Sequence, residues 1–226
     1  MKSPIKVIGI SISIAAAFAL TTLTTQAQPN LLSDPNFASG TVVPSGMGGW
    51  ATFGNASFST AFTLGPTAYS MDLSGSGGFS VPGSFQYDPA TPGTSYLLTG
   101  YGYIPNTLPS GTSEGFLQIT FVDSTTTQNL GTVQTSPGHA LVSNAITSSS
   151  PTGTWIFMSE IATAPAGTAY AEPFTLVLDQ NPTTVYFDEL SLTAVPEPSS
   201  LALLGIGMAG LFYVVRRRKV ASPLAR

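Results

Sequence analysis

Residues 28–194 consist of short runs in which apolar and polar side chains alternate, separated by glycine and proline. Alternation is typical of β-strands, because successive side chains of a strand point to opposite faces of the sheet. No stretch of this region sustains a helical apolar period between capping residues. The clearest strand patterns are those of residues 94–104, 115–123, 154–162, 171–179 and 184–193.

The faces of these strands predict how they pack. Leu117, Ile119 and Phe121 share one face of their strand, and Trp155 lies among apolar neighbours that place it in the core. Several runs are apolar on both faces, which suits the inner layers of two packed sheets. The sequence therefore predicts an all-β domain over residues 28–194, a two-sheet β-sandwich of about eight to ten short strands.

The first 27 residues have the pattern of a signal peptide. Lys2 and Lys6 precede an apolar or small stretch at 7–23, and Thr25-Gln26-Ala27 resembles a cleavage site. We expect signal peptidase to cut after Ala27. The alternative is an uncleaved membrane anchor, because the apolar stretch is long for a signal peptide.

The end of the chain has three parts. A polar motif at 195–200 is followed by an uncharged apolar span at 201–215 and a tail at 216–226. As a helix the span is roughly 22 Å long, shorter than the ~30 Å hydrocarbon core of a bilayer. The tail opens with a basic stop that fixes topology, consisting of Arg216, Arg217, Arg218 and Lys219.

The span also contains a G-x-G-x-x-G pattern at residues 205–210. A dinucleotide loop requires a preceding strand and a βαβ unit, and neither is present in the pattern here. Small residues spaced for helix packing explain the glycines better.

Taken together, Pro196, Glu197 and Pro198, the apolar span and the basic stop resemble the PEP C-terminal (PEP-CTERM) sorting signal. The resemblance implies recognition of the Pro-Glu-Pro motif by an exosortase in the inner membrane of a Gram-negative bacterium. It further implies removal of the tail and transfer of the domain to the cell surface, outer membrane or extracellular matrix. A plain C-terminal anchor with a stiff proline-containing stalk is the alternative.

The charge distribution excludes several functions. All seven Lys and Arg residues lie in the two terminal segments, whereas all eleven Asp and Glu residues lie between Val7 and Val215. Without cations the domain could not neutralise phosphates, so nucleic acid is excluded as a partner. Because the chain has no cysteine, disulfides, thiol catalysis and thiolate metal sites are excluded too.

Several segments of the domain occur in the order found in jelly-roll carbohydrate-binding modules of the galactose-binding-like type. They are the opening segment 30–40 with Trp50 after it, Pro92-Gly93-Thr94-Ser95-Tyr96, Gly153-Thr154-Trp155 and the closing segment 185–192. The resemblance implies a jelly-roll sandwich. It also implies a structural Ca²⁺ held between the opening segment and the closing strand.

The proposed calcium site depends on Asp188 in the closing strand. Ala38 stands where an acidic residue is common in the family, so Asp34 or backbone carbonyls near Asn36 are the candidate substitute ligands. In a regular strand Asp188 shares a face with Tyr186, Leu190 and Leu192. A carboxylate there requires calcium, backbone N–H groups or hydroxyls as partners, unless it is exposed.

Catalysis has little support in the sequence. His139 is the sole histidine and lies in a turn-like segment without a G-x-S-x-G elbow, and one histidine is too few for a zinc site. Carboxylates for glycoside hydrolysis are available but show no pairing in their spacing: Glu114, Asp123, Glu160 and Glu172. We therefore predict no enzyme activity and no catalytic residue.

Ligand binding is easier to support. Tyr101 and Tyr103 alternate on one strand face beside Gly100 and Gly102, whose missing side chains leave room for a shallow platform. Trp50 is a further candidate for stacking on a sugar ring.

The sequence as a whole predicts an exported surface or matrix protein, processed by an exosortase, that acts as a non-catalytic polysaccharide-binding module. A structural matrix protein without a specific ligand and a glycan-active hydrolase are the alternatives.

Overall fold

In the computed structural model of the protein, residues 28–66, 68–109, 113–134 and 145–196 are described, together with Gly207 and Gly210. The described residues up to Pro196 form strands, turns and loops without a helix. The strands are β1 (Ala51–Phe53), β2 (Ala56–Ser59), β3 (Ser70–Gly75), β4 (Gly83–Phe85), β5 (Asp88–Pro89), β6 (Ser95–Tyr103), β7 (Glu114–Val122), β8 (Asn129–Gln134), β9 (Trp155–Thr163), β10 (Tyr170–Leu178) and β11 (Thr183–Val195).

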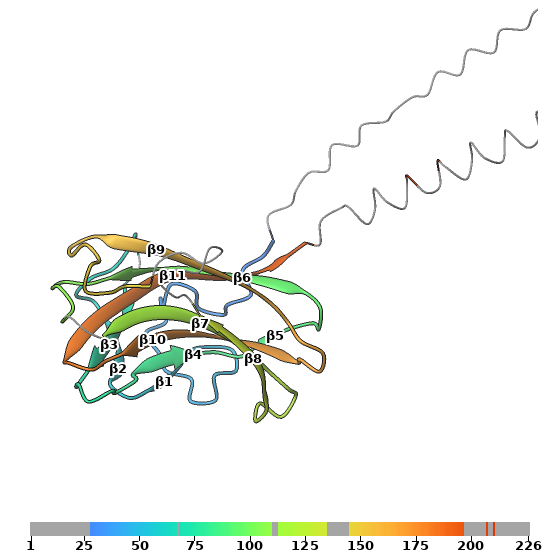
Figure 1. Cartoon of the computed structure of the whole chain (residues 1–226), viewed down its shortest axis with the longest axis horizontal. Helices are drawn as coiled ribbons and strands as arrows, with labels where there is room; N and C mark the ends of the chain where they lie inside the picture. The colour runs from blue at the N-terminus through green and yellow to red at the C-terminus, as the bar shows by residue number, and fades with distance from the viewer. Residues whose placement is uncertain are drawn as a thin grey trace, which may run out of the picture.

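These strands form two antiparallel sheets that pack face to face (Figure 1). Sheet I has the order β1-β4-β10-β7-β8, with β5 pairing with β10, and sheet II has the order β2-β3-β11-β6-β9. The prediction of an all-β, two-sheet jelly-roll-like sandwich is confirmed. The five clearest patterns became β6, β7, β9, β10 and β11, each shifted by no more than a few residues.

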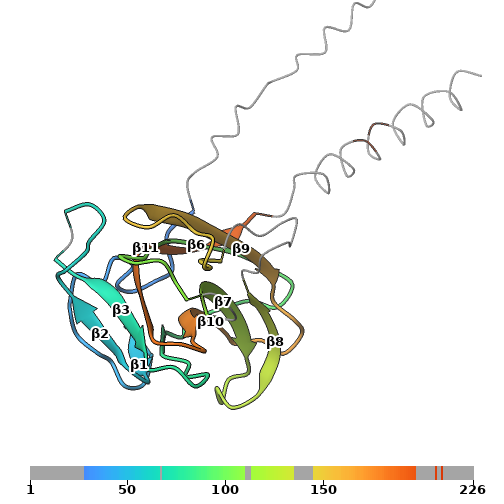
Figure 2. The same ribbon diagram turned by 60° about the vertical axis from the view of Figure 1, so that its left-hand side comes forward.

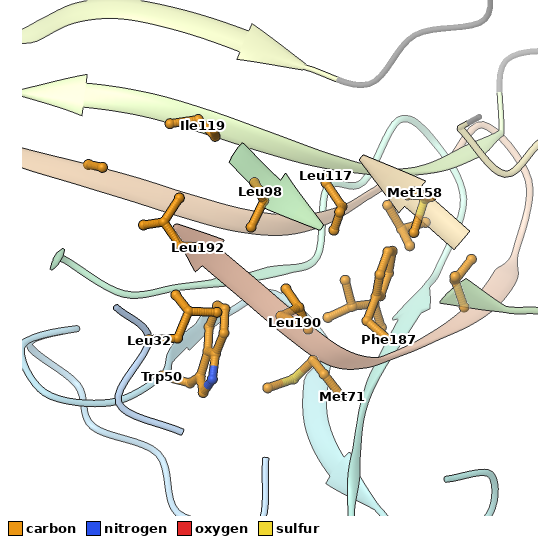
Figure 3. Packing of buried hydrophobic residues seen from close by; sticks show 14 of the residues in the cluster. Leu32, Trp50, Met71, Leu98, Leu117, Ile119, Met158, Phe187, Leu190 and Leu192 are labelled. Carbon is orange, nitrogen blue, oxygen red and sulfur yellow. The ribbon is translucent and has the colours of Figure 1, made fainter. Parts of the chain in front are cut away.

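The core fills the space between the sheets (Figure 3). Leu117 and Ile119 of β7 point from sheet I toward Leu190 and Leu192 of β11 in sheet II, and all four side chains are buried. Leu117 and Ile119 lie on the face predicted for them. Because a closed core of this size separates two solvent-facing sheet surfaces, any ligand surface must lie on an outer face or at an end of the sandwich.

The two ends of the sandwich differ. At the tail end, the opening segment runs beside the end of β11, where the backbone N–H of Leu31 donates to the carbonyl of Leu192 over 2.8 Å. Figures 1 and 2 show that the first and the last residues of the described domain both lie at this tail end. The opposite or distal end carries the turns after β3, β6 and β10. Strand β11 spans both ends, so they are about 40 Å apart at 3.3 Å per residue.

Several predicted segments lie outside the described residues. They are the signal peptide at 1–27, most of the span at 201–215, the basic stop at 216–219, and His139, Glu197 and Pro198. Pro196 follows β11 directly and is exposed. Within the part of the chain that is described, no helix has the length and apolar character needed to cross a membrane.

Candidate functional site

The outer face of sheet II carries the tyrosines proposed as a platform. Tyr101 and Tyr103 of β6 pair with Phe157 and Trp155 of β9, so the four rings share this face. Phe157 is 45% exposed and its ring lies 5.3 Å from that of Tyr101. Trp155 is only half-buried, so the prediction that it belongs to the core is wrong: β9 turns it outward.

A loop at residues 60–66 covers the Tyr103 end of this platform. The ring of Phe62 stacks on Tyr103 with centroids 4.6 Å apart and meets Tyr186 at 5.0 Å. The backbone N–H of Leu64 donates to Asp188 over 2.7 Å, which ties the loop to β11. Tyr103 is therefore sandwiched between protein rings, and the uncovered aromatic surface of sheet II lies around Tyr101 and Phe157.

Asp188 faces the outer side of sheet II, on the same face as Tyr186. It pairs with Tyr101, but a β-bulge follows, so that Ser191 is the next residue in register with β6. Glu189 adopts a φ of 51° in this bulge. The bulge adds one residue to β11, which reverses the faces toward which the following side chains point. Leu190 and Leu192 consequently point into the core, and the prediction that they share a face with Asp188 is wrong.

The Asp188 carboxylate is fully buried and accepts hydrogen bonds from the backbone N–H groups of Leu64 and Glu189. Backbone N–H groups are one of the kinds of partner that we expected for the Asp188 carboxylate. Asp34 accepts from the backbone and hydroxyl of Ser39. No group of three or more His, Cys, Asp or Glu residues within the described ranges is placed to hold a metal ion. Calcium binding stays a prediction of the family resemblance.

Trp50 is a core residue, and its assignment to a ligand surface is wrong. Its side chain is 1% exposed, its ring lies 5.0 Å from that of Phe37, and its indole N–H donates to the carbonyl of Asp34 over 2.6 Å. Figure 3 shows it next to Leu32. Buried in this way, Trp50 fixes the opening segment to the sandwich and presents no ring face to a ligand.

The outer face of sheet I was missed by sequence reasoning and is the richer surface. Phe85 of β4 pairs with Phe174 of β10, which pairs with Gln118 of β7. The ring of Phe85 lies 5.5 Å from that of Phe174 and 5.4 Å from that of Tyr87, and Tyr87 lies 6.2 Å from Tyr170. All four rings are half-buried, so each keeps an accessible part. They form what we call the sheet I aromatic row: Phe85, Tyr87, Tyr170 and Phe174.

Polar groups lie beside this row. The Tyr87 hydroxyl donates a hydrogen bond to the carboxyl of Glu172. Burial raises the pKa of Glu172 to about 7, against the lowering effect of that hydrogen bond. The Gln118 amide donates to the Thr120 hydroxyl over 3.1 Å, which orients its carbonyl oxygen on the same face. Along the outer face of β10, Glu172 therefore lies between the rings of Tyr170 and Phe174.

The segment 84–88 reverses the usual distribution of side chains. Its polar members Ser84, Gln86 and Asp88 are buried, whereas Phe85 and Tyr87 face outward. The inward placement leaves Nε2 of Gln86 and Oδ2 of Asp88 without a hydrogen-bond partner in the described structure. Burying such groups costs stability, and aromatic rings gathered on an outer face are typical of interaction sites. A sequence reading by hydrophobicity places these rings in the core, which is why it missed the surface.

The four carboxylates considered for hydrolysis do not form a catalytic arrangement. Glu160 faces the core, and the Asp123 carboxylate accepts hydrogen bonds from Thr125 in the β7–β8 turn. Glu114 and Glu172 share the outer face of sheet I but are in register with residues 178 and 120, which places them about 20 Å apart. Paired glycosidase carboxylates are about 5 to 9.5 Å apart.

Comparison with known proteins identifies the C-terminal segment. Residues 194–219 match the PEP-CTERM protein-sorting motif, so the chain carries this motif where the sequence predicted it. The motif implies export, sorting at the membrane of a Gram-negative bacterium and an exosortase as the processing partner. No curated protein matches the chain significantly.

Solved structures share the fold of the sandwich. The CBM22-1 xylan-binding domain of Paenibacillus barcinonensis Xyn10C aligns with a TM-score of 0.51 and 13% identity, over 76% of this chain and 99% of that domain. An arabinose-bound MgGH51 α-L-arabinofuranosidase aligns with a TM-score of 0.51 and 15% identity, over 73% of this chain and 26% of the enzyme.

The enzymatically active domain of bacteriophage CBA120 tailspike protein 4 aligns with a TM-score of 0.50 and 14% identity, over 74% of this chain and 21% of that one. The chain thus spans about a quarter or less of the two enzymes. At these identities the likeness shows the jelly-roll fold alone.

Proposed function

We propose that the sandwich is a non-catalytic module of an exosortase-processed surface protein and binds a neutral polysaccharide on the outer face of sheet I. The observation that carries the proposal is the reversed segment 84–88, which turns Phe85 and Tyr87 outward at the cost of burying polar side chains. Folding alone favours the opposite arrangement, so the half-buried rings that face outward point to a ligand.

The chemistry of the face suits a sugar polymer. Aromatic rings stack against the C–H faces of pyranose rings, and a few convergent polar groups fix orientation, as in other ligand sites. Here the aromatic row supplies the rings, and Gln118 and Glu172 supply hydrogen-bonding groups on the same face. Because no Lys or Arg occurs between Val7 and Val215, uronate or sulfate groups find no cation to pair with.

The comparisons support this proposal in two ways. The sorting motif implies a place at the cell surface, where polysaccharide is available. The xylan-binding domain from Paenibacillus barcinonensis has the same fold over nearly its whole length, so the fold is compatible with sugar binding.

Affinity electrophoresis of the exported protein, in gels that contain single polysaccharides, tests this function. We expect retardation by at least one neutral polymer among xylan, glucomannan, galactan and β-glucan, and none by polygalacturonate. Retardation by polygalacturonate alone would contradict the charge argument, and free migration in every gel would contradict the function.

Truncation of single aromatic side chains tests whether the polymer binds on the outer face of sheet I. We expect Phe85→Ala and Tyr170→Ala to weaken binding to the retarding polymer about tenfold each, because both remove stacking area from the aromatic row. Tyr101→Ala, on the outer face of sheet II, is the matched control and should bind as the wild type does. Circular dichroism and melting curves establish that each variant is folded.

One observation favours the alternative of a structural matrix protein. Strand β9 is an edge of sheet II and exposes Phe157 and Ile161, which are 45% and 39% exposed. Apolar edge strands favour pairing between chains. Concentration-dependent self-association in sedimentation velocity, together with free migration in every gel, would favour this alternative.

A further inference from the structure

A cavity opens at the distal end of the sandwich, and none of the rings of the aromatic row is among its lining residues. Its volume is about 460 Å³, within the range of small-ligand sites. It lies between the segment after β6 and the beginnings of β11 and the β3–β4 turn. Its lining is Gly75, Pro105, Asn106, Thr107, Pro109, Pro182, Thr183, Thr184 and Tyr186. None of these side chains is ionised at neutral pH, so the cavity suits an uncharged, polar ligand.

A hydrogen-bond chain fixes the role of Thr184 in this cavity. The Ser74 hydroxyl donates to the Asp72 carboxylate over 2.7 Å and lies 3.0 Å from the Thr184 hydroxyl. Since the Ser74 hydroxyl has a single proton and donates it to Asp72, the Thr184 hydroxyl must be the donor in its hydrogen bond with Ser74. The Thr184 oxygen therefore offers the cavity only lone pairs and acts as an acceptor.

Tyr186 is held in the same way. Its hydroxyl donates to Asp72, and burial, followed by the Asp72 charge, raises the pKa of Tyr186. The phenolic proton is thus engaged, and the oxygen is left as an acceptor. The floor of the cavity carries two acceptors backed by one carboxylate, which favours ligands that present hydroxyl donors and disfavours anions.

The rest of the lining supplies adaptable groups. The side chains of Asn106, Thr107 and Thr183 make no hydrogen bond with the described residues. An amide and two hydroxyls can donate and accept, which matches the paired donors and acceptors of sugar hydroxyls. The adjoining prolines give the cavity rigid apolar walls.

An exposed, strained aromatic residue lies at the same end of the molecule. Phe79 is 58% exposed and has a φ of 64°, a left-handed conformation that aromatic residues rarely adopt. Its turn is held close to the cavity wall, because the backbone N–H of Gly78 donates to the carbonyl of Gln180 over 3.1 Å, two residues before Pro182. Backbone strain at an exposed ring is typical of functional sites.

From these features we infer that the distal cavity is a second saccharide site, which takes one or two sugar units of a neutral glycan. Sugar hydroxyls donate to Thr184 and Tyr186, and the ring of Phe79 stacks on the following unit. The choice of a neutral glycan as ligand rests on the proposed function, whereas the choice of the distal cavity as the site does not. The site lies about 40 Å from the end of the sandwich at which β11 leads into the sorting motif.

Calorimetric titration of the full chain tests the inference, in a detergent without a sugar headgroup and with xylohexaose, β-1,4-galactotriose and tri-galacturonate as probes. We expect at least one neutral probe to bind and tri-galacturonate not to bind. Thr184→Val keeps the shape of the side chain and removes its acceptor, so the neutral probe should bind about fivefold more weakly or worse. Thr193→Val, on the same face of β11 at its other end, should bind normally.

Two further variants separate this site from the sheet I face. Phe79→Ala should weaken binding of the neutral probe without lowering the melting temperature, whereas a purely structural residue would lower it. Phe85→Ala should leave probe binding unchanged while it reduces retention by the polymer. If Phe85→Ala abolishes probe binding and Thr184→Val does not, the cavity is no saccharide site and the proposed function stands. If no neutral probe binds the wild type, the inference fails, whatever the polymer gels show.

Discussion

Raising the pH from 5 to 8.5 should lower the melting temperature of the protein by about 10 °C. The cause is a set of three carboxyl groups buried in a domain without a single Lys or Arg: Asp88, Glu160 and Glu172. Burial raises the pKa of Asp88 to about 7 and that of Glu160 to about 8. Neither oxygen of Glu160 has a hydrogen-bond partner within the described residues.

The direction of the effect follows from proton binding. In the unfolded chain these carboxyls ionise near pH 4, whereas in the folded protein they keep their protons to pH 7 or 8. Between these limits the folded state binds more protons, so stability falls as the pH rises. The loss begins above about pH 4 and levels off above about pH 8, and on the order of 3 kcal/mol is a conservative total. Asp123, whose pKa its hydrogen bond with Thr125 lowers, acts only below this window.

Glu160→Gln separates this effect from general alkaline instability. Glu160 pairs with the fully buried Leu98 on the inner face of sheet II, and the amide has the same shape without the ionisation. We expect the variant to melt several degrees higher than the wild type at pH 8.5 and within about 2 °C of it at pH 5. A wild-type melting temperature that is constant or rises from pH 5 to 8.5 would contradict the explanation.

Truncation of Trp50 should destabilise the protein more than truncation of any ring on the outer faces of the sheets. Trp50→Ala removes a fully buried indole packed against Phe37, and such truncations cost about 3 to 5 kcal/mol. It also removes the 2.6 Å hydrogen bond to the carbonyl of Asp34. We expect the melting temperature to fall by at least about 10 °C in differential scanning calorimetry.

Trp50→Phe is the matched variant, because it keeps most of the packing and loses the indole N–H. It should cost about 1 to 2 kcal/mol. At a temperature where both variants are folded, their affinity for polysaccharide should equal that of the wild type. A folded Trp50→Phe protein with normal stability and no polysaccharide binding would contradict this expectation and indicate that Trp50 contacts the ligand.

The fold could be predicted from sequence where strands are long and alternate regularly. Leu117, Ile119 and Phe121 have a period of two and lie in the core as expected. The short strands β1, β4 and β5 were beyond that approach, since two or three residues carry no measurable period. Such short strands form because of their neighbours: β4 is a strand because it pairs with β10, not because of an alternating pattern in its own sequence.

The candidate sites were harder to predict for physical reasons. The bulge after Asp188 changes which residues of β11 face the core, and nothing in a single sequence marks a bulge at a non-glycine residue. The loop that places Phe62 on Tyr103 is a contact between distant segments. At 84–88 the hydrophobic pattern itself predicts the wrong face, since Phe85 and Tyr87 lie on the outer face of sheet I while Ser84, Gln86 and Asp88 are buried.

Hydroxyl-radical footprinting of the exported protein, with and without the neutral polysaccharide that retards it most, tests the central claim most directly. Mass spectrometry then reports the labelling of each aromatic side chain. We expect the polymer to protect Phe85, Tyr87, Tyr170 and Phe174, and to leave labelling of Tyr101 and Phe157 unchanged. Protection of Tyr101 and Phe157 with full labelling of the sheet I aromatic row would contradict the account.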